Sequence, residues 1–370
     1  MSQLFTPIQI GGLSLPNRIV VAPMCQYSAE NGEATDWHLI HLGQLAISGA
    51  GLLIIEATSV SPEGRITPGD LGLYSEATES ALANVLQSVK RYSRIPIAIQ
   101  LAHAGRKASS YAPWEGGALI PTESGGWRTV SPSAIAHIEG EELPVALDDA
   151  GLERTLKSFA EAARRADRIG IDAIEVHAAH GYLLHQFLSP HANKRNDAYG
   201  GSLQNRMRFP LSVFREVREA FSPGKPVGVR ISATDWIEGG WDVEESIALC
   251  KALEALGCAY IHVSSGGVSI KQKIPLGPGY QVHLADQIKK QVSIPVIAVG
   301  LITEPEQAET ILASGQADMV ALARGMLYDP RWPWHAAVKL GAKLAAPHQY
   351  WRAQPHGQES IFSESCTGQR

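Results

Sequence analysis

The chain has 370 residues, of which 45% are hydrophobic and 19% charged, an ordinary composition for a soluble globular protein with a large core. Its formal net charge of -5 gives no electrostatic reason to expect nucleic acid or an anionic membrane as a partner. The four cysteines are scattered without a CxxC pair, which argues against a zinc ribbon, an iron–sulfur cluster and a disulfide framework. Because the N-terminus has no signal-peptide pattern and no apolar run approaches the roughly 20 residues that cross a bilayer, we expect a cytoplasmic protein.

Eight short apolar runs alternate with helical segments along almost the whole chain. Most of these runs are continuously apolar, as expected of parallel strands that are covered on both faces. In chain order, the predicted strands span 17–24, 50–57, 95–102, 171–177, 225–232, 258–265, 294–300 and 317–323.

The segments between the strands carry helix start and stop signals. The clearest helices are predicted over 148–170, 242–257 and 303–315, each of which ends at or before a glycine. The predicted N-terminal caps are Asp148 or Asp149, Asp242 with Glu245, and Thr303 with Glu306. Within 202–221, Pro210 lies inside a helical pattern, so we expect it to kink the helix or to mark its first turn.

Eight strand–helix units in about 250–300 residues predict a TIM (β/α)8 barrel, an α/β fold, as a single domain. A doubly wound sheet is the main alternative, but the first strand is not followed by the GxGxxG turn that such a sheet would use to bind a dinucleotide. Two long connections, 103–147 and 178–201, follow the third and fourth strands. Both lie at the carboxyl ends of strands, where barrel enzymes carry their active sites.

The residues at the predicted strand ends are Pro23, Met24, Cys25, Tyr27, Ala57, Thr58, Gln100, His103, Arg106, His177, His180, Tyr182, Arg230, Gly300, Ala323, Arg324 and Gly325. This set contains no carboxylate pair of the glycosidase type and no lysine after the sixth or seventh strand, which weighs against a Schiff-base aldolase. Gly300, Ala323 and Arg324 follow the last two strands and suit the phosphate site that many barrels carry there.

His177, His180 and Tyr182 form the most distinctive group. A metal site is a weak interpretation, because no third ligand stands at a suitable spacing, and we predict no metal. A pair of hydrogen-bonded structural histidines is an equally good interpretation of these residues taken alone.

Several longer motifs stand out, namely "PMCQY" (23–27), "EGRITPG" (63–69), "QLAHAGRK" (100–107), "PSAI" (132–135), "HAAHGYLLHQFLSP" (177–190), "NKRNDAYGGSLQNRMRF" (193–209) and "ALARGML" (321–327). These motifs resemble the old yellow enzyme family of FMN-dependent ene-reductases, and within it the class that includes bacterial NADPH dehydrogenases and xenobiotic reductases. They run in matching order from about residue 3 to 352, and the motifs at 177–190 and 193–209 are the most specific.

The resemblance implies non-covalent FMN, with NADPH or NADH as co-substrate. The implied FMN-binding residues are Gly300, Ala323 and Arg324 at the phosphate, Ala22, Pro23, Met24, Cys25 and Ala57 along the isoalloxazine, Gln100 at the pyrimidine edge, and Arg230 near N1 and O2. A fixed cation near N1 stabilises the negative charge that reduction places on the flavin.

The resemblance also implies catalytic roles. His177 and His180 would hydrogen-bond the carbonyl or nitro oxygen of an electron-poor alkene, the implied small-molecule partner. Hydride would then reach its β-carbon, and Tyr182 would protonate the α-carbon, because a phenol stays protonated at pH 7. Tyr27 would add a substrate contact and Cys25 would tune the flavin.

In this class a C-terminal arginine, here Arg352, reaches into a neighbouring subunit's active site, which implies a homodimer or homotetramer. A surface tail is the alternative. We therefore predict an FMN-binding barrel over 1–352 with a flexible tail over 353–370. Residues 112–128 are expected to form a lid over the pocket.

Three rival functions remain on this evidence. The chain could be a barrel of the same fold that acts mainly on nitrate esters or nitroaromatics, a flavin-binding redox sensor with little turnover, or a phosphate-binding barrel without flavin. We interpret His38 and His41 as packed helix residues, and Asp197, Tyr199, Asn205 and Arg206 as residues that order the fourth loop.

Overall fold

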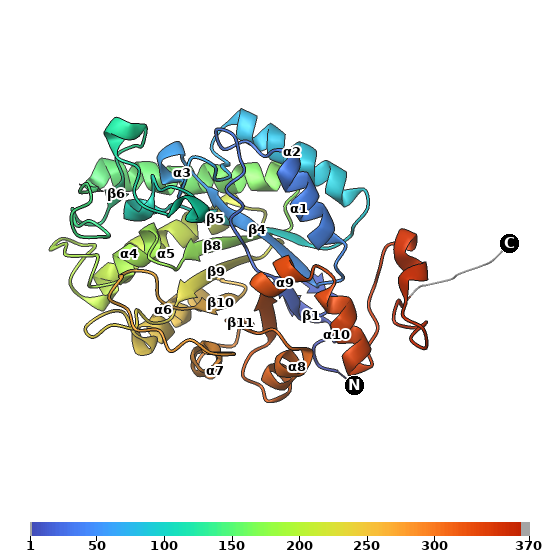
Figure 1. The fold of residues 1–370 in the computed structure, drawn as a ribbon. Coiled ribbons are helices and arrows are strands. Elements are labelled where there is room, and N and C mark those ends of the chain that lie inside the picture. The colour runs from blue at the N-terminus through green and yellow to red at the C-terminus, as the bar shows by residue number, and fades with distance from the viewer. Residues whose placement is uncertain (1, 364–370) are drawn as a thin grey trace.

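The computed structural model describes residues 2–363, and its centre is a closed barrel of eight parallel strands (Figure 1). The barrel strands are β3 (Ile19–Val21), β4 (Leu52–Ser59), β5 (Ile97–Ala102), β8 (Ala173–Ala178), β9 (Val227–Ser232), β10 (Ile261–Ser264), β11 (Val296–Val299) and β12 (Met319–Leu322). They pair in chain order, and β12 pairs with β3 to close the ring. Each strand coincides with one predicted apolar run, so the TIM-barrel prediction is confirmed.

Helices surround this barrel (Figure 1). They are α1 (Asp36–Ala46), α2 (Glu76–Lys90), α3 (Asp149–Arg168), α4 (Leu183–Leu188), α5 (Leu203–Ala220), α6 (Val243–Ala255), α7 (Val282–Lys289), α8 (Pro305–Ala313), α9 (Arg324–Tyr328) and α10 (Trp332–Leu340). Helix α3 starts as predicted, since Asp148 accepts a hydrogen bond from the Gly151 amide at 2.7 Å. Asp242 caps α6 in the same way.

One of the two alternatives predicted for Pro210 is excluded, and one predicted cap is wrong. Pro210 does not mark the first turn of α5, because the helix already begins at Leu203, with the Ser202 hydroxyl capping it. Helix α8 begins at Pro305 with Glu304 at the N-cap position, so Thr303 is not its cap. A proline favours the first position of a helix, where its missing N–H is not needed, and this preference sets the start of α8.

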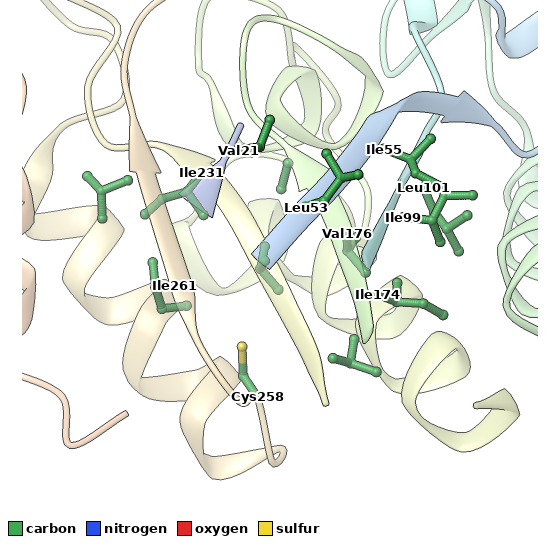
Figure 2. Packing of buried hydrophobic residues seen from close by; sticks show 14 of the residues in the cluster. Val21, Leu53, Ile55, Ile99, Leu101, Ile174, Val176, Ile231, Cys258 and Ile261 are labelled. Atoms are coloured by element: carbon green, nitrogen blue, oxygen red, sulfur yellow. The ribbon is translucent and has the colours of Figure 1, made fainter. Parts of the chain in front are cut away.

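The strands separate two apolar cores. Outward-facing side chains pack against the helices, as Figure 2 shows for Leu53, Ile99 and Val176 among others. Inward-facing side chains such as Val20, Ala98 and Ile297 fill the barrel itself, and this cluster also includes Ile10 and Leu15. These last two belong to the hairpin of β1 (Ile8–Ile10) and β2 (Leu13–Leu15), so the hairpin closes the amino-terminal end of the barrel.

The inside of the barrel is apolar on one half and polar on the other. The inward residues of β3, β4, β11 and β12 are Val20, Ala22, Leu52, Ile54, Ile297, Val299, Met319 and Ala321. The inward residues of β5, β8, β9 and β10 include Gln100, Glu175, Arg230 and His262, all buried. Since side chains alternate along a strand, a polar residue two positions from an inward residue also points inward. This division positions the site described below.

The long connections after β5 and β8 dock on each other. The first contains short 3-10 turns at Gly105–Lys107, Pro113–Glu115 and Thr122–Ser124, and a small sheet of β6 (Val130–Ser131) and β7 (Val145–Ala146). The Leu183 amide donates to the His103 carbonyl at 2.9 Å, and the Lys194 amide to the Ser133 hydroxyl at 2.9 Å. The two loops therefore form one layer over the carboxyl ends of the strands.

The ordered part of the chain extends beyond residue 352, where we predicted the barrel domain to end. Ile361 and Phe362 are buried, and the Phe362 ring lies 4.9 Å from that of Trp334 on α10. The Leu344 amide donates to the Ile361 carbonyl at 2.9 Å. The remainder of the predicted tail, 364–370, lies outside the described residues. Between residues 2 and 363, no helix has the length and apolar character needed to cross a membrane.

Candidate active site

His177, His180 and Tyr182 come together at the carboxyl end of β8. The His177 ring centroid lies 5.0 Å from that of His180 and 5.0 Å from that of Tyr182, with the rings nearly perpendicular in both pairs. His180 adopts a left-handed backbone conformation with φ of 58°. The next residue must be glycine, because a Cβ on Gly181 would lie 2.1 Å from the Gly267 carbonyl oxygen. This tight turn presents both imidazoles to the barrel mouth.

Hydrogen bonds define which ring nitrogens of the two histidines carry hydrogen. His177 Nδ1 accepts from the Ala179 amide at 3.2 Å, so the hydrogen of a neutral His177 is on Nε2. His177 Nε2 lies 3.3 Å from His180 Nδ1, and His180 Nε2 lies 2.7 Å from the Ser264 hydroxyl. A consistent chain of donors therefore runs from His177 to His180 and on to Ser264.

Burial determines the charge of these three side chains. It lowers the pKa of both His177 and His180 well below the usual value, and the nearby Arg230 cation lowers it further. Burial also raises the pKa of Tyr182 well above its usual value. At neutral pH the site therefore presents two uncharged imidazoles and a protonated phenol.

Cys25 and Tyr27 lie on the loop after β3, close to the end of β4. The Ala57 backbone and the Tyr27 hydroxyl both interact with the Cys25 thiol, and burial raises its pKa well above the usual range, so the thiol stays protonated. Tyr27 has a φ of 51°, and the exposed Trp114 ring packs edge-on against it at 5.6 Å. The predicted lid segment thus touches a predicted substrate-binding residue.

The polar half of the barrel places Gln100 and Arg230 below this group. Gln100 Nε2 donates to Glu175 Oε1 at 2.7 Å, and His262 Nδ1 lies 2.9 Å from Glu175 Oε2. Arg230 pairs in register with both His177 and His262 on the neighbouring strands. The sequence interpretation missed Glu175 and His262. Glu175 stands two residues before His177, and His262 two residues before Ser264, so each shares the inward face of its strand with that residue.

Several features of this site fit a flavin. Arg230 is buried, and its Nε has no hydrogen-bond partner among the described residues. Gly300 has a φ of 126°, and a Cβ there would lie 2.7 Å from Gln281 Nε2, so the backbone is left bare at this point. Ala323 and Arg324 start α9, whose first N–H groups lack partners within the helix. A guanidinium, a free amide oxygen and bare backbone are the donor and acceptor set that FMN requires.

The loops frame a cavity of about 200 Å³ beside Tyr27. Tyr111, Leu119 and Ile138 give it apolar walls, and Lys107 lines its base. Lys107 donates to the His180 carbonyl at 2.8 Å, which links the connection after β5 to the turn after β8. Arg106 likewise holds the loops, since it donates to the Val268 carbonyl at 2.8 Å.

The residues that we interpreted as structural make structural contacts. Asn205 donates to the Gly200 carbonyl at 3.1 Å, Asp197 accepts from the Tyr199 amide at 2.9 Å, and Arg206 pairs with Glu245 of α6. His38 and His41 are buried in α1.

Arg352 lies in a 3-10 turn (His348–Ala353) and is exposed. In Figure 1 this segment lies beyond α10, on the side of the molecule opposite β6. Within one chain, therefore, Arg352 is not part of the site. The prediction that it serves a neighbouring subunit stays a prediction.

The barrel and the flavin-compatible site define the chain as a flavin-dependent oxidoreductase of the TIM-barrel type. The chain belongs to the NADH:flavin oxidoreductase / NADH oxidase family, whose model matches residues 3–342. FMN and NAD(P)H are accordingly its cofactor and coenzyme, and the predicted resemblance to old yellow enzyme is confirmed.

Individual relatives agree with this assignment. The NADPH dehydrogenase of Geobacillus thermodenitrificans is 43% identical over 351 residues, covering 94% of this chain and 98% of that protein. Morphinone reductase in complex with tetrahydroNAD superposes with a TM-score of 0.75 at 31% identity, covering 93% of this chain and 92% of that one. The old yellow enzyme homologue from Zymomonas mobilis gives a TM-score of 0.75 at 28% identity, covering 93% and 94%.

Proposed function

We propose that this enzyme is an ene-reductase, which reduces the double bond of an α,β-unsaturated carbonyl compound or nitroalkene at the expense of NAD(P)H. The observation that carries the proposal is the pair of neutral imidazoles, His177 and His180, whose facing nitrogens are 3.3 Å apart beside a protonated phenol. Two N–H donors that converge on one oxygen polarise a conjugated double bond, and a nearby acid completes its reduction.

His177 is ready to bind the substrate oxygen. Its Nδ1 is fixed as an acceptor by the Ala179 amide, so its Nε2–H faces His180 and can turn to a carbonyl oxygen that enters between the rings. When a carbonyl oxygen replaces this contact between the rings, His180 becomes the second donor by a change of tautomer, in which the Ser264 hydroxyl donates to its Nε2 and the His180 hydrogen is on Nδ1. The substrate oxygen then accepts from both rings.

Tyr182 is the proton donor of the proposed reaction. Burial keeps its hydroxyl protonated at neutral pH, and its ring packs 5.0 Å from that of His177. The substrate that His177 holds is therefore next to an acid. The phenol gives its proton to the α-carbon and regains one from solvent.

FMN supplies the hydride in this reaction. Gln100, Arg230 and the bare backbone at Gly300 would hold it, with Ala22, Pro23, Met24, Cys25 and Ala57 along its ring and Ala323 and Arg324 at its phosphate. Since coenzyme and acceptor would both bind on the flavin face beside His177 and His180, they must bind in turn, and the steady-state kinetics should be ping-pong.

We also propose that the enzyme works as a homo-oligomer, in which Arg352 of one chain reaches the active site of another. The exposure of Arg352 within one chain supports this proposal. Removal of the side chain by Arg352→Ala should weaken acceptor binding without changing the oligomeric state in solution.

The test of the function separates the two half-reactions. In stopped-flow experiments under anaerobic conditions, Tyr182→Phe should slow reoxidation by cyclohexenone by about 10²-fold or more, because its general acid is lost. Reduction by NADPH should change less than about twofold. Tyr92→Phe, at an exposed tyrosine of the surface, is the matched control and should change neither rate.

Two results would contradict the proposal. An unchanged rate of reoxidation in Tyr182→Phe would show that Tyr182 is not the proton donor. A wild-type enzyme that takes up NADPH electrons but is not reoxidised by enones, nitroalkenes or nitrate esters would instead be a redox sensor.

A further inference from the structure

Glu175 is a buried carboxylate that the proposed reaction does not use. It stands on β8 two residues before His177, and its exposed fraction is 0%. Both of its oxygens have partners: Oε1 accepts from Gln100 Nε2 at 2.7 Å, and Oε2 lies 2.9 Å from His262 Nδ1. A charged group this deep in a barrel is costly unless it is fully hydrogen-bonded, as this one is.

The carboxylate dictates how its partners are oriented. An ionised carboxylate only accepts hydrogen bonds, so Gln100 must turn its NH₂ group toward Glu175. The Gln100 carbonyl oxygen is then free to face the barrel mouth, where the flavin pyrimidine edge is expected. For the same reason, His262 must carry its hydrogen on Nδ1. Its Nε2 is buried without a partner among the described residues, so the neutral ring is a donor to Glu175 and nothing more.

Glu175 also faces the only guanidinium of this inner group. On the neighbouring strand Glu175 pairs in register with Gly228, and Arg230 lies two positions beyond that glycine; the two side chains interact electrostatically. Since His262 is neutral, the buried charges beneath the site are one carboxylate and one guanidinium. The carboxylate therefore weakens the attraction that Arg230 alone would exert on added negative charge.

We propose that Glu175 is a positioning residue of the flavin site, which fixes the orientation of the Gln100 amide and offsets the charge of Arg230, so that it holds down the reduction potential of bound FMN. The proposal goes beyond the ene-reductase function, because it concerns the cofactor and not the acceptor. It depends on FMN binding alone.

The test compares the affinities of oxidised and reduced FMN in Glu175→Gln. This nearly isosteric change removes the negative charge, so reduced FMN should gain affinity relative to oxidised FMN by about tenfold. For a two-electron couple, a tenfold ratio corresponds to about 30 mV, here in the positive direction. The potential is read from dye-equilibrated reductive titrations without any acceptor, and the affinities from titration of apoprotein with FMN.

Two further variants separate the parts of the proposal. Glu175→Asp keeps the charge but is one methylene shorter, so it should weaken FMN binding through loss of the Gln100 contact while the potential stays near that of the wild type. Glu245→Gln, at a half-buried carboxylate on α6 that pairs with Arg206 outside the barrel, is the matched control and should change neither quantity.

A purely structural role would give a different pattern. If Glu175→Gln weakens oxidised and reduced FMN equally and leaves the potential unchanged, the proposal is overturned. If that variant does not fold, Glu175→Asp decides: weaker FMN binding at an unchanged potential supports the proposal, and unaltered binding overturns it. None of these outcomes depends on enone reduction, so failure of the proposed function is seen separately in the acceptor assays.

Discussion

Two buried carboxyls, one in each half of the barrel mouth, have opposite protonation behaviour. Asp70, on the loop after β4 above the apolar half, accepts hydrogen bonds from Ile66 and Thr67, yet burial raises its pKa to about 7. Glu175, in the polar half, would also have a raised pKa through burial, but His262 and Arg230 hold its pKa below the usual value. The two carboxyls are buried to the same extent. Their pKa values differ because Glu175 has basic neighbours.

This difference shows how the barrel divides its tasks. The polar half of β5, β8, β9 and β10 contains a hydrogen-bonded group, in which Glu175 contacts Gln100 and His262, with the buried Arg230 guanidinium nearby. The inward residues of β3, β4, β11 and β12 are apolar, and the backbone is bare at Gly300. The buried carboxylate on β4, Glu56, pairs with His38 of α1. Substitutions in the two halves should therefore destabilise the protein in different ways.

The largest effect is expected from removal of the guanidinium in the polar half. Arg230→Met should lower the free energy of unfolding of the apoprotein by about 4 kcal/mol, since it leaves the Glu175 carboxylate buried without its cation. Urea unfolding at pH 7 measures this. The double variant Arg230→Met with Glu175→Gln should regain at least about 1 kcal/mol of that loss. Strictly additive losses would mean that the two charges are not coupled.

A cavity in the apolar half should cost somewhat less and show no such coupling. Ile297 on β11 is fully buried inside the barrel, and Ile297→Ala should cost about 3 kcal/mol by the same unfolding measurement. Ile297→Val removes one methylene and should cost about 1 kcal/mol. Neither loss should depend on pH between 5 and 8, because no titrating group is uncovered. A clear pH dependence would show that the apolar half is not independent of the charged network.

Some features of the fold and of the candidate site follow from the sequence, and others do not. The strands, the closed barrel and the group at the end of β8 follow from continuous apolar runs and from the spacing of His177, His180 and Tyr182. The Glu175–His262 pair does not, because partners on β8 and β10 are 87 positions apart and meet only when the barrel closes. The sequence does show that side chains alternate between the two faces of the strand, so that Glu175 and His177 lie on the same face.

Local rules also failed where two signals competed. Thr303 and Glu306 have capping-box spacing, but Pro305 fixes the first position of α8 and moves the cap to Glu304. Pro210 suggested a kink or a helix start, and the helix start is excluded, because α5 extends past it on both sides with Phe209 and Val213 packed in the outer core. In both places tertiary contacts or a proline preference outweighed a four-residue pattern.

A smaller effect, confined to a pH window, is expected at Asp70. Its pKa is about 7 in the folded chain against roughly 3.9 for an unfolded aspartate, so the folded state retains a proton that the unfolded state has lost. This contribution to stability is present below about pH 4 and is lost as the pH rises through 7. The side chain of Asp70→Asn cannot titrate. The variant should therefore lack the wild type's decrease in the free energy of unfolding between about pH 4 and 7, which is at most about 1.4 kcal/mol per pH unit.

The measurement is urea unfolding of both proteins at pH 5 and pH 8. The stability of Asp70→Asn relative to the wild type should increase from the lower to the higher pH. Asp172→Asn, at a half-exposed carboxylate near Lys90, serves as control and should not reproduce this trend. A constant difference between the two proteins would show that Asp70 is ionised in the fold.

The smallest effect is expected outside the barrel, and it sharpens the comparison because it touches neither half. Asp148 caps α3 through its hydrogen bond from the Gly151 amide, and Asp148→Ala should cost about 1 kcal/mol of unfolding free energy. FMN affinity, the reduction potential and both half-reactions should stay at wild-type values, because the capping hydrogen bond joins Asp148 to Gly151 and involves no residue of the candidate site. Asp148→Asn should recover most of the loss, since an amide oxygen also accepts from the helix N-terminus. If this remote change moved the potential as much as Glu175→Gln, then general loosening of the fold, and not the charge beside Gln100, would explain the behaviour of the flavin site.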